Sequence, residues 1–439
     1  QALSATIPEG AIPTARPRFT ELVATSFRIG CLGFGGPAGQ IALMHRIFVD
    51  EKKWIDEPRY LHALNYCMLL PGPEAQQLAT YVGWLLHGVR GGLVAGALFV
   101  LPGALVVFGL SWLYVLHAQT PLVAALLYGV KAAVLAFVVE ALVKIGNRAL
   151  KTRLDLWIAG LAFIALYLFG APFPLVMIGA GVFGLVRARS APMPTPTIAT
   201  DQASARGALS AAAPSAVLWL APVAIALIVL GRGHVLTDVG ILFSELAVVT
   251  FGGAYAVLAY LQQQAGDAHG WLSAGQMIDG LGLAETTPGP LILVNQFVAF
   301  LAGWQAQGGS FGLAVACAAM ASWCTFAPSY LWIFAGAPYA ERLRQNRFAT
   351  GALAGITAAV LGVIANLALW FGLHVIFARD LVFPTPWGRT IAAPELMSFE
   401  LLAALIALGA AIALIRFKAN VLLVILACAL AGLVHLAGM

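Results

Sequence analysis

The sequence predicts an all-α integral membrane protein built as an inverted repeat, with two six-segment halves and one connecting helix between them (6+1+6). Few charged residues, long apolar segments and motifs that recur at a fixed spacing predict this fold. Of the 439 residues, 61% are hydrophobic and 10% are charged, with a mean hydropathy of +0.89, whereas a soluble domain carries about a quarter charged residues. A backbone in lipid must satisfy its own hydrogen bonds, and alternating strand patterns are absent, so the segments are expected to be helices.

The apolar segments divide the chain into five parts. We expect a cytoplasmic lead-in at residues 1–18, a first membrane repeat at 19–187, a polar linker at 188–213, a connecting transmembrane helix at 214–234 and a second, inverted repeat at 235–439. About 20 residues of helix cross a bilayer core. The apolar segments fall at about 19–48, 60–88, 91–117, 121–146, 154–170, 172–187, 215–231, 238–264, 277–304, 308–337, 348–378, 398–416 and 419–438.

The two repeats are copies of each other. Phe34-Gly35-Gly36 recurs as Phe251-Gly252-Gly253, and Pro71-Gly72-Pro73 recurs as Pro288-Gly289-Pro290, both at a numbering offset of 217. Trp54 recurs as Trp271 at the same offset. Further along the offset becomes 226, because of one insertion of about nine residues before Pro102 and its counterpart Pro328. Chance does not keep one spacing across three separate motifs, so the sequence predicts a duplication.

The number of segments orients the repeats. An even half followed by one extra helix places the second half upside down in the membrane, as in many secondary transporters whose binding site lies where the halves meet. On this topology one side collects fifteen basic loop residues and the other side seven. Because basic loops face the cytoplasm, we expect a multi-pass membrane protein with a cytoplasmic N-terminus and a periplasmic or external C-terminus.

The first candidate site is the Gly-Gly break. Pro37 is expected at the first position of a new half-helix, where its missing amide costs nothing, with Gln40 one turn further on. Free amides around Gly35 and Gly36 would then attract an anion. The alternative is close helix packing through small residues, and it weighs equally for Gly252 and Gly253 in the second repeat.

The second candidate site is the Pro-Gly-Pro break. Pro71, Gly72 and Pro73 restart a helix that carries Glu74 and Gln76 in its first turn. The matching element of the second repeat has Glu285 before the break, and the hydroxyls of Thr286 and Thr287 and the backbone at Gly289 are candidate contacts for an anion. Each pair of broken segments is expected either to span the membrane or to re-enter it.

Two basic residues, Arg28 and Lys131, lie inside apolar segments. A charge there costs several kcal/mol, so each is expected to face an anion, water or a partner such as Glu140 or Glu74. Arg28 aligns with Glu245 at the repeat offset, which suggests a pair between the repeats or, more simply, drift after duplication. Because Glu74, Glu245 and Glu285 would repel a dianion when ionised, we expect one of them to couple transport to protons.

Several classes of function are excluded or disfavoured. The net charge is +5, but the sequence has no basic run for nucleic acid. The five cysteines lie mostly in apolar segments without metal-ligand spacing, and no nucleotide-binding motif appears. We therefore expect no cofactor and no metal, and a protein that is not an enzyme.

The paired motifs resemble the chromate transporter family. The resemblance rests on Arg28 before Gly33-Phe34-Gly35-Gly36-Pro37, on Leu70-Pro71-Gly72-Pro73, and on their second-repeat counterparts, and it covers nearly the whole chain. It implies an inner-membrane protein that exports chromate and a relation to sulfate, a dianion of similar shape. The family signature falls on Arg28, Gly35, Gly36, Pro37 and Pro71–Pro73. We expect export to be coupled to protons or to the membrane potential. Import of sulfate or another oxyanion and an oxyanion channel are the alternatives, with chromate or sulfate and the lipid bilayer as partners. The sequence leaves a homodimer open.

Overall fold

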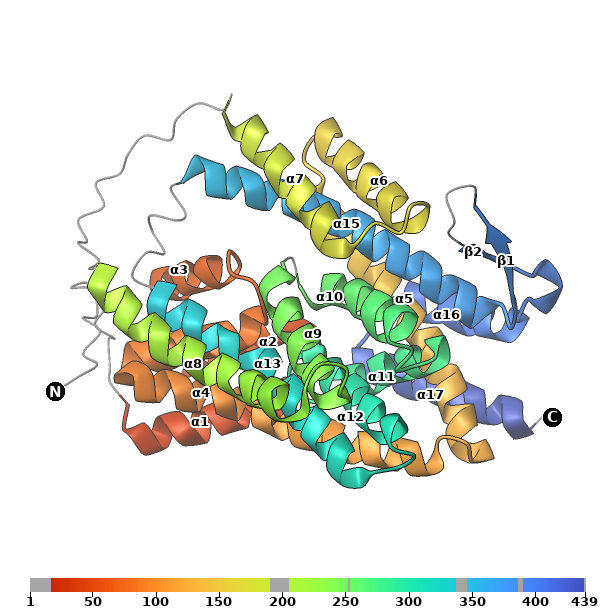
Figure 1. The fold of residues 1–439 in the computed structure, drawn as a ribbon, viewed down its shortest axis with the longest axis horizontal. Helices are drawn as coiled ribbons and strands as arrows, with labels where there is room; N and C mark the ends of the chain where they lie inside the picture. Colours follow the sequence, from red (N-terminus) through yellow and green to blue (C-terminus); the bar gives the residue numbers. More distant parts are fainter. Residues whose placement is uncertain (1–16, 190–204, 252, 337–345, 386–389, 438–439) are drawn as a thin grey trace. The chain divides into compact units, whose positions relative to one another are not determined.

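The structure, a computed structural model, describes residues 17–189, 205–251, 253–336, 346–385 and 390–437 (Figure 1). Most of these residues are helical, as the sequence predicts. The strands that the structure describes form an antiparallel hairpin of β1 (Asp380–Pro384) and β2 (Thr390–Pro394), in which Val382 pairs with Ala392. This hairpin lies in the connection between the predicted apolar segments 348–378 and 398–416, so those segments are helical as expected.

The described residues form two compact units, each of which draws on both repeats. The first takes the described residues within Gln1–Gly109, Ala191–Ala254 and Thr287–Thr350, and the second those within Leu110–Ser190, Tyr255–Thr286 and Gly351–Met439. The helices of the first unit are α1 (Phe19–Leu32), α2 (Gly36–His45), η1 (Arg46–Glu51), α3 (Glu57–Cys67), most of α4 (Glu74–His117), α8 (Ala205–Leu230), α9 (Val235–Val249), η3 (Leu291–Leu293), α12 (Val294–Ala306) and α13 (Phe311–Gly336).

The second unit holds the end of α4 and the remaining helices. They are α5 (Pro121–Ala149), α6 (Arg153–Tyr167), α7 (Phe173–Ala188), nearly all of α10 (Ala254–Leu261), η2 (Gln262–Ala268), α11 (Ala274–Thr286), nearly all of α15 (Arg347–Ile376), η5 (Leu396–Ser398), α16 (Leu401–Ile415) and α17 (Val421–Ala437). Within the described residues, five helical stretches are long and apolar enough to cross a membrane, and shorter apolar helices accompany them. The chain is a multi-pass membrane protein.

The helices end at all four predicted breaks. α1 stops before Gly35, α3 before Pro71-Gly72-Pro73, α9 before Gly253 and α11 before Gly289, and a new helix begins within three residues of each of these glycines. Gly36, Gly72, Gly253 and Gly289 all have positive φ, between +70° and +111°. This conformation is strained for residues with a Cβ, and the prolines remove further helical hydrogen bonds, so the sequence itself dictates these interruptions.

The stretch called α4 is two helices joined by a sharp turn. His87 and Gly88 leave the helical region inside it, with Gly88 at a φ of +63°. A Cβ on Gly83 would lie 2.4 Å from the carbonyl oxygen of Gly91, and one on Gly91 would lie 2.2 Å from that of Gly83. Eight residues of straight helix would separate these positions by about 12 Å, so the chain folds back here, at the predicted boundary between two segments.

A π-helical turn occurs at the same place in each repeat. In the first unit η1 precedes Trp54, whose amide donates to the carbonyl oxygen of Phe48 at 2.9 Å. In the second unit η2 precedes Trp271, whose amide donates to the carbonyl oxygen of Ala265 at 2.7 Å. Trp54 and Trp271 correspond at the repeat offset of 217, and so do Phe48 and Ala265. The repeats therefore share backbone geometry as well as motifs.

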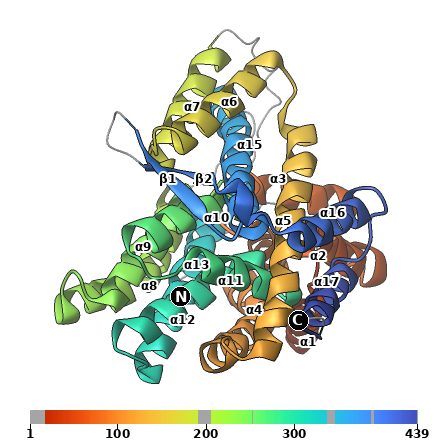
Figure 2. The same ribbon diagram turned by 90° about the vertical axis from the view of Figure 1, so that its right-hand side faces the viewer.

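The long helices of the second unit pair across the repeats. α5 packs against α16 and α17 (Figure 2), with Gly129 directly against the backbone of Cys428. α15 lies beside α6 and α7 (Figure 1), with Gly355 directly against the backbone of Ala180. Gly129 and Gly355 correspond at the later offset of 226 and so occupy matching positions. Small residues thus let backbones approach closely, and each repeat supplies the helices that cover the other.

Candidate functional site

A cavity in the first unit lies where all four helix breaks meet. Each break contributes the first residues of the helix that follows it, so α2, α4, α10 and the η3–α12 stretch all begin at the cavity. The lining residues are Pro37, Gln40, Gly72, Pro73, Glu74, Ala75, Thr250, Gly253, Ala254, Pro290, Leu291 and Ile292. Both copies of the Gly-Gly break and both copies of the Pro-Gly-Pro break therefore lie around this one cavity.

Helix starts give this cavity its electrostatic character. The first amides of a helix have no partner within the helix, and the aligned peptide dipoles leave a partial positive charge at that end. Four such ends at one cavity favour an anion there. Among the described lining residues Glu74 is the acidic one. The cavity volume of about 20 Å³ is room for about one water molecule, so a larger anion requires the breaks to move apart.

Two reciprocal backbone hydrogen bonds join the repeats beside the cavity. The amide of Gly72 donates to the carbonyl oxygen of Thr250 at 2.9 Å, and the amide of Gly289 donates to that of Gly33 at 3.0 Å. The repeat offset of 217 relates Gly72 to Gly289, and it also relates Gly33 to Thr250. The same contact is therefore made twice with the roles of the repeats exchanged, as in an interface with two-fold symmetry.

The buried side chain of Gln40 reinforces one of these contacts. Its Nε2 donates to the carbonyl oxygen of Gly289 at 2.6 Å and to that of Gly33 at 3.1 Å, while its Oε1 has no hydrogen-bond partner among the described residues. Gln40 is 0% exposed. Since buried polar atoms are normally satisfied, this oxygen is an acceptor that a donor entering the cavity region, such as a water molecule or a protonated oxyanion, would satisfy.

A second group of buried polar atoms lies behind the Pro-Gly-Pro break. Gln77 donates from Nε2 to the carbonyl oxygen of Pro71 at 2.7 Å, and a Cβ on Gly72 would lie 3.7 Å from Oγ of Ser329. Gln76 is also fully buried, and the Tyr330 hydroxyl is a polar neighbour of its side chain. By distance and angle, neither amide atom of Gln76 has a hydrogen-bond partner in the described part of the chain, and the same holds for Oγ of Ser329.

Some predicted site residues line the cavity and others do not. The lining includes Pro37, Gln40, Gly72, Pro73, Glu74 and Gly253. Gly35, Gly36, Pro71, Gln76, Thr287 and Gly289 lie in or next to the breaks without lining it. Gly252 falls outside the described residues. Thr286 belongs to the second unit, where its hydroxyl donates to the carbonyl oxygen of Leu283 at 2.7 Å.

The two charged residues at matching positions both have exposed side chains. Arg28 on α1 faces Glu51 at 3.9 Å, an acidic partner other than the examples Glu140 and Glu74. Its side chain is 54% exposed, which suits the end of a segment or a watery surface more than buried hydrocarbon. Glu245 is exposed on α9. Neither residue lines the cavity.

The second unit holds a buried ionic cluster that the sequence indicated only in part. Lys131 on α5 faces Asp279 on α11, with Nζ 3.4 Å from Oδ2, and the Tyr114 hydroxyl donates to the same oxygen at 2.9 Å. The expected partner Glu140 is instead 2.6 Å from Lys144. The available signal for Asp279 was its position as an acidic residue inside the apolar segment 277–304. On the same helix, Glu285 accepts from the Tyr255 hydroxyl at 2.6 Å.

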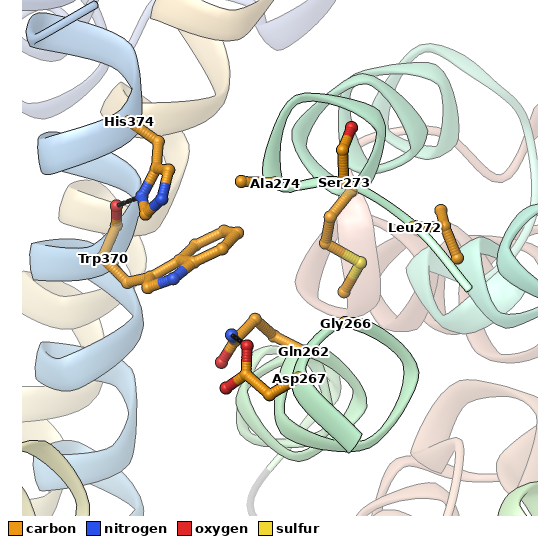
Figure 3. A pocket seen from close by; sticks show the side chains of 9 residues that line it. Gln262, Gly266, Asp267, Leu272, Ser273, Ala274, Trp370 and His374 are labelled. Carbon is orange, nitrogen blue, oxygen red and sulfur yellow. Dashed lines mark hydrogen bonds between the residues drawn. The ribbon is translucent and has the colours of Figure 1, made fainter. Parts of the chain in front are cut away.

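A polar cavity of about 160 Å³ lies between α15 and the η2–α11 region of the second unit (Figure 3). Trp370 and His374 form one wall, and Gln262, Asp267 and Ser273 lie on the opposite side (Figure 3). Nε2 of Gln262 donates to Oδ1 of Asp267 at 3.0 Å. Sequence motifs did not indicate this cavity, because its residues come from segments about 100 positions apart.

The family is decided by comparison with known sequences. The profile described as "Chromate transporter" matches residues 20–185 and again residues 237–433. The chain belongs to the chromate transporter family. The two matched ranges coincide closely with the two repeats predicted from the motif offsets, so the family's characteristic unit occurs twice in this chain.

Two proteins named for chromate transport match most of the chain, and a shorter transporter matches about a third of it. A chromate transport protein from Pseudomonas aeruginosa is 33% identical over 393 residues, which is 85% of this chain and 88% of that protein. One from Cupriavidus metallidurans is 29% identical over 408 residues, 92% of this chain and 94% of that protein. An uncharacterized transporter of Bacillus subtilis, YwrB, is 30% identical over 152 residues, 35% of this chain and 76% of that protein. No solved structure matches the chain.

Proposed function

We propose that this member of the chromate transporter family is a secondary transporter that exports chromate from the cytoplasm across the inner membrane. Similarity over nearly the full length to proteins named for chromate transport supports the substrate. The family profile covers both repeats, so the resemblance includes the residues around the cavity. The protein is a transporter in this proposal and carries out no chemical conversion of chromate.

The observation that carries the proposal is the meeting of four helix starts at one cavity. A tetrahedral dianion needs several donors that converge from different directions, and helix amides supply them without bringing countercharges. Backbone amides at Gly253 and Ala254 and at the start of α4 are the donors we assign. Glu74 at the same cavity opposes a dianion when ionised, so it is a candidate for coupling transport to protons.

The reciprocal contacts between the repeats support an inverted-repeat arrangement as the basis of transport. The reciprocal bonds of Gly72 with Thr250 and of Gly289 with Gly33 are the contacts expected where two oppositely oriented copies meet. In this proposal the broken segments rock about that contact and expose the cavity to one side at a time. The N-terminus is cytoplasmic and the C-terminus external, on the basis of the loop charges.

The remaining predicted residues keep proposed roles. Arg28, exposed beside Glu51, attracts the dianion by its charge, and Gly35, Gly36 and Pro71 shape the breaks. Thr287, buried next to the second Pro-Gly-Pro motif, supports that break. Glu245 and Glu285 remain candidates for coupling with Glu74.

Flux measurements in inside-out membrane vesicles test the function. We expect labelled chromate to accumulate in vesicles that contain the protein, with saturation, and unlabelled chromate outside to exchange with labelled chromate inside. Uptake of sulfate without chromate would refute the substrate assignment and favour the sulfate carrier. Flux that never saturates and shows no exchange would favour a channel.

A cavity variant ties the flux to the proposed site. Ala254→Leu adds bulk at the start of α10, inside the lining, and is expected to abolish chromate flux. Ala97→Leu makes the same change at an exposed position of α4 and should leave the flux unchanged. Equal flux in the two variants at equal amounts of folded protein would show that chromate does not pass through this cavity.

A further inference from the structure

Asp279 is a buried carboxylate whose surroundings only partly satisfy it. It is 4% exposed on α11. One oxygen, Oδ2, takes both the Tyr114 hydrogen bond at 2.9 Å and the Lys131 ammonium at 3.4 Å. The other oxygen, Oδ1, is buried and has no hydrogen-bond partner among the described residues. A carboxylate can accept about four hydrogen bonds, so the ionised form is under-satisfied in this position.

The cationic partner of Asp279 has access to solvent. The Lys131 side chain is 30% exposed, against 6% for that of Asp279. Its Nζ lies 3.3 Å from where a Cβ of Gly275 would be, beside the first turn of α11. Ser273 and Ala274, at the same end of α11, line the polar cavity seen in Figure 3. Lys131 therefore lies near both the buried Asp279 carboxylate and the end of α11 that lines the polar cavity.

The other titratable groups nearby are engaged elsewhere. α11 packs against α5 and η2. On α5, Glu140 is bound to Lys144, and on η2, Asp267 accepts from Gln262. On α11 itself, Glu285 accepts from Tyr255 of α10. His374, on the far wall of the cavity, lies 3.2 Å from Asp380. Among the described residues, the groups that contact the Asp279 carboxylate are thus the Lys131 ammonium and the Tyr114 hydroxyl.

Such a pair is suited to taking up and releasing a proton. Burying an ion pair costs several kcal/mol per ion unless the geometry is excellent and the remaining lone pairs are filled, and here one oxygen is left unfilled. Protonation converts the Asp279 carboxylate to a neutral acid, whose O–H becomes a donor, and frees Lys131 to face the cavity. Loss of that proton restores the ion pair. Acidic residues inside membrane segments often form proton relays of this kind.

We propose that Asp279 is the proton-binding carboxylate of the transport cycle and that Lys131 is its countercharge. The inference rests on the proposed transport function and replaces Glu74, Glu245 and Glu285 as the first candidate for coupling. One proton binds Asp279 from one side of the membrane and leaves to the other, so the net charge moved with each chromate dianion changes by one.

Comparing two modes of transport tests the proposal. In proteoliposomes, exchange of labelled for unlabelled chromate needs no net proton movement, whereas accumulation driven by a pH gradient does. Asp279→Asn is expected to retain chromate exchange while its pH-driven accumulation falls at least tenfold. Asp155→Asn is the control: it alters another buried aspartate of the second unit, which is paired with Arg187 at 2.8 Å, and it should keep both modes.

The outcomes separate this inference from the proposed function. Wild-type protein that moves no chromate in either mode would overturn the function itself. Wild-type transport that ignores the pH gradient, or pH-driven accumulation that survives Asp279→Asn, would overturn the inference alone. If Asp279→Asn fails to fold, the double variant Asp279→Asn with Lys131→Met, which leaves no unpaired charge, takes its place. Loss of exchange as well as accumulation in folded double variant would show that the pair is structural, against the proposal.

Discussion

The amide of Gly72 and the carbonyl oxygen of Thr250 form a hydrogen bond of 2.9 Å that links the Pro-Gly-Pro break of one repeat to the Gly-Gly break of the other. Its counterpart from Gly289 to Gly33 measures 3.0 Å. Both donors are glycines with positive φ, +111° for Gly72 and +95° for Gly289. The two repeats therefore hold the cavity together through one contact used twice, and each half of the contact can be tested separately.

Gly72→Ala and Gly289→Ala are expected to destabilise the protein to a similar extent. A Cβ at positive φ is strained by about 1–3 kcal/mol, and in Gly72→Ala it would also lie 3.0 Å from Nε2 of Gln77. Thermal unfolding in detergent should show a lower midpoint for both. Gly109→Ala, on a helix with nothing within 4 Å of the added atom, should unfold as the wild type does. A large loss in one glycine variant and none in the other would contradict the equivalence of the two contacts.

Gln40→Met should weaken both folding and transport. Methionine keeps the size of the side chain but removes the donor to the buried carbonyl oxygen of Gly289, and an unsatisfied buried acceptor costs about 1–3 kcal/mol. Unfolding midpoints and chromate flux measure the two effects. Gln305→Met, at an exposed position near the end of α12, provides the matched control. Unchanged stability in Gln40→Met would show that Gln40 does not secure the break.

Glu74→Gln is expected to tighten chromate binding. The carboxyl group lies at the cavity where four helix starts favour an anion, so removing its charge removes a repulsion worth about 1 kcal/mol or more, or about fivefold in Kd. Equilibrium binding of chromate to purified protein at neutral pH measures this change. Weaker binding by Glu74→Gln would mean that the carboxyl group acts as a protonated donor to the substrate.

The sequence predicted the features that depend on local chemistry. Glycine-proline motifs interrupt helices wherever they stand, so all four breaks followed from the residues alone. Repetition of those motifs placed the two copies, and the family profile matches both. The fold-back at Gly83 and Gly91 was also visible as a boundary between two apolar segments.

Contacts between distant residues could not be predicted in the same way. Gln40 looked like part of the Gly-Gly motif, yet its main partner is Gly289, 249 positions away. Lys131 was recognised as a costly charge, but several acids competed as its partner, and only the packing of α11 on α5 identifies Asp279. The exchange of covering helices between the repeats, with Gly129 against Cys428, likewise depends on tertiary packing that motif spacing does not encode.

Arg28→Gln is expected to slow transport in a way that depends on salt. The side chain is 54% exposed, so its contribution is long-range attraction of the dianion, which is screened over about 8 Å at physiological ionic strength and over about 30 Å at 0.01 M. The ratio kcat/KM for chromate should fall several-fold at low salt, and the difference from the wild type should fade as salt rises. Stability should change by less than about 1 kcal/mol, as for other exposed ion pairs. Arg46→Gln removes the other arginine that faces Glu51, at 3.4 Å, and so controls for loss of that pairing. An equal effect from both variants would contradict a specific role of Arg28 and indicate a general effect of surface charge. An effect of Arg28→Gln that persists at high salt would indicate direct contact with the substrate.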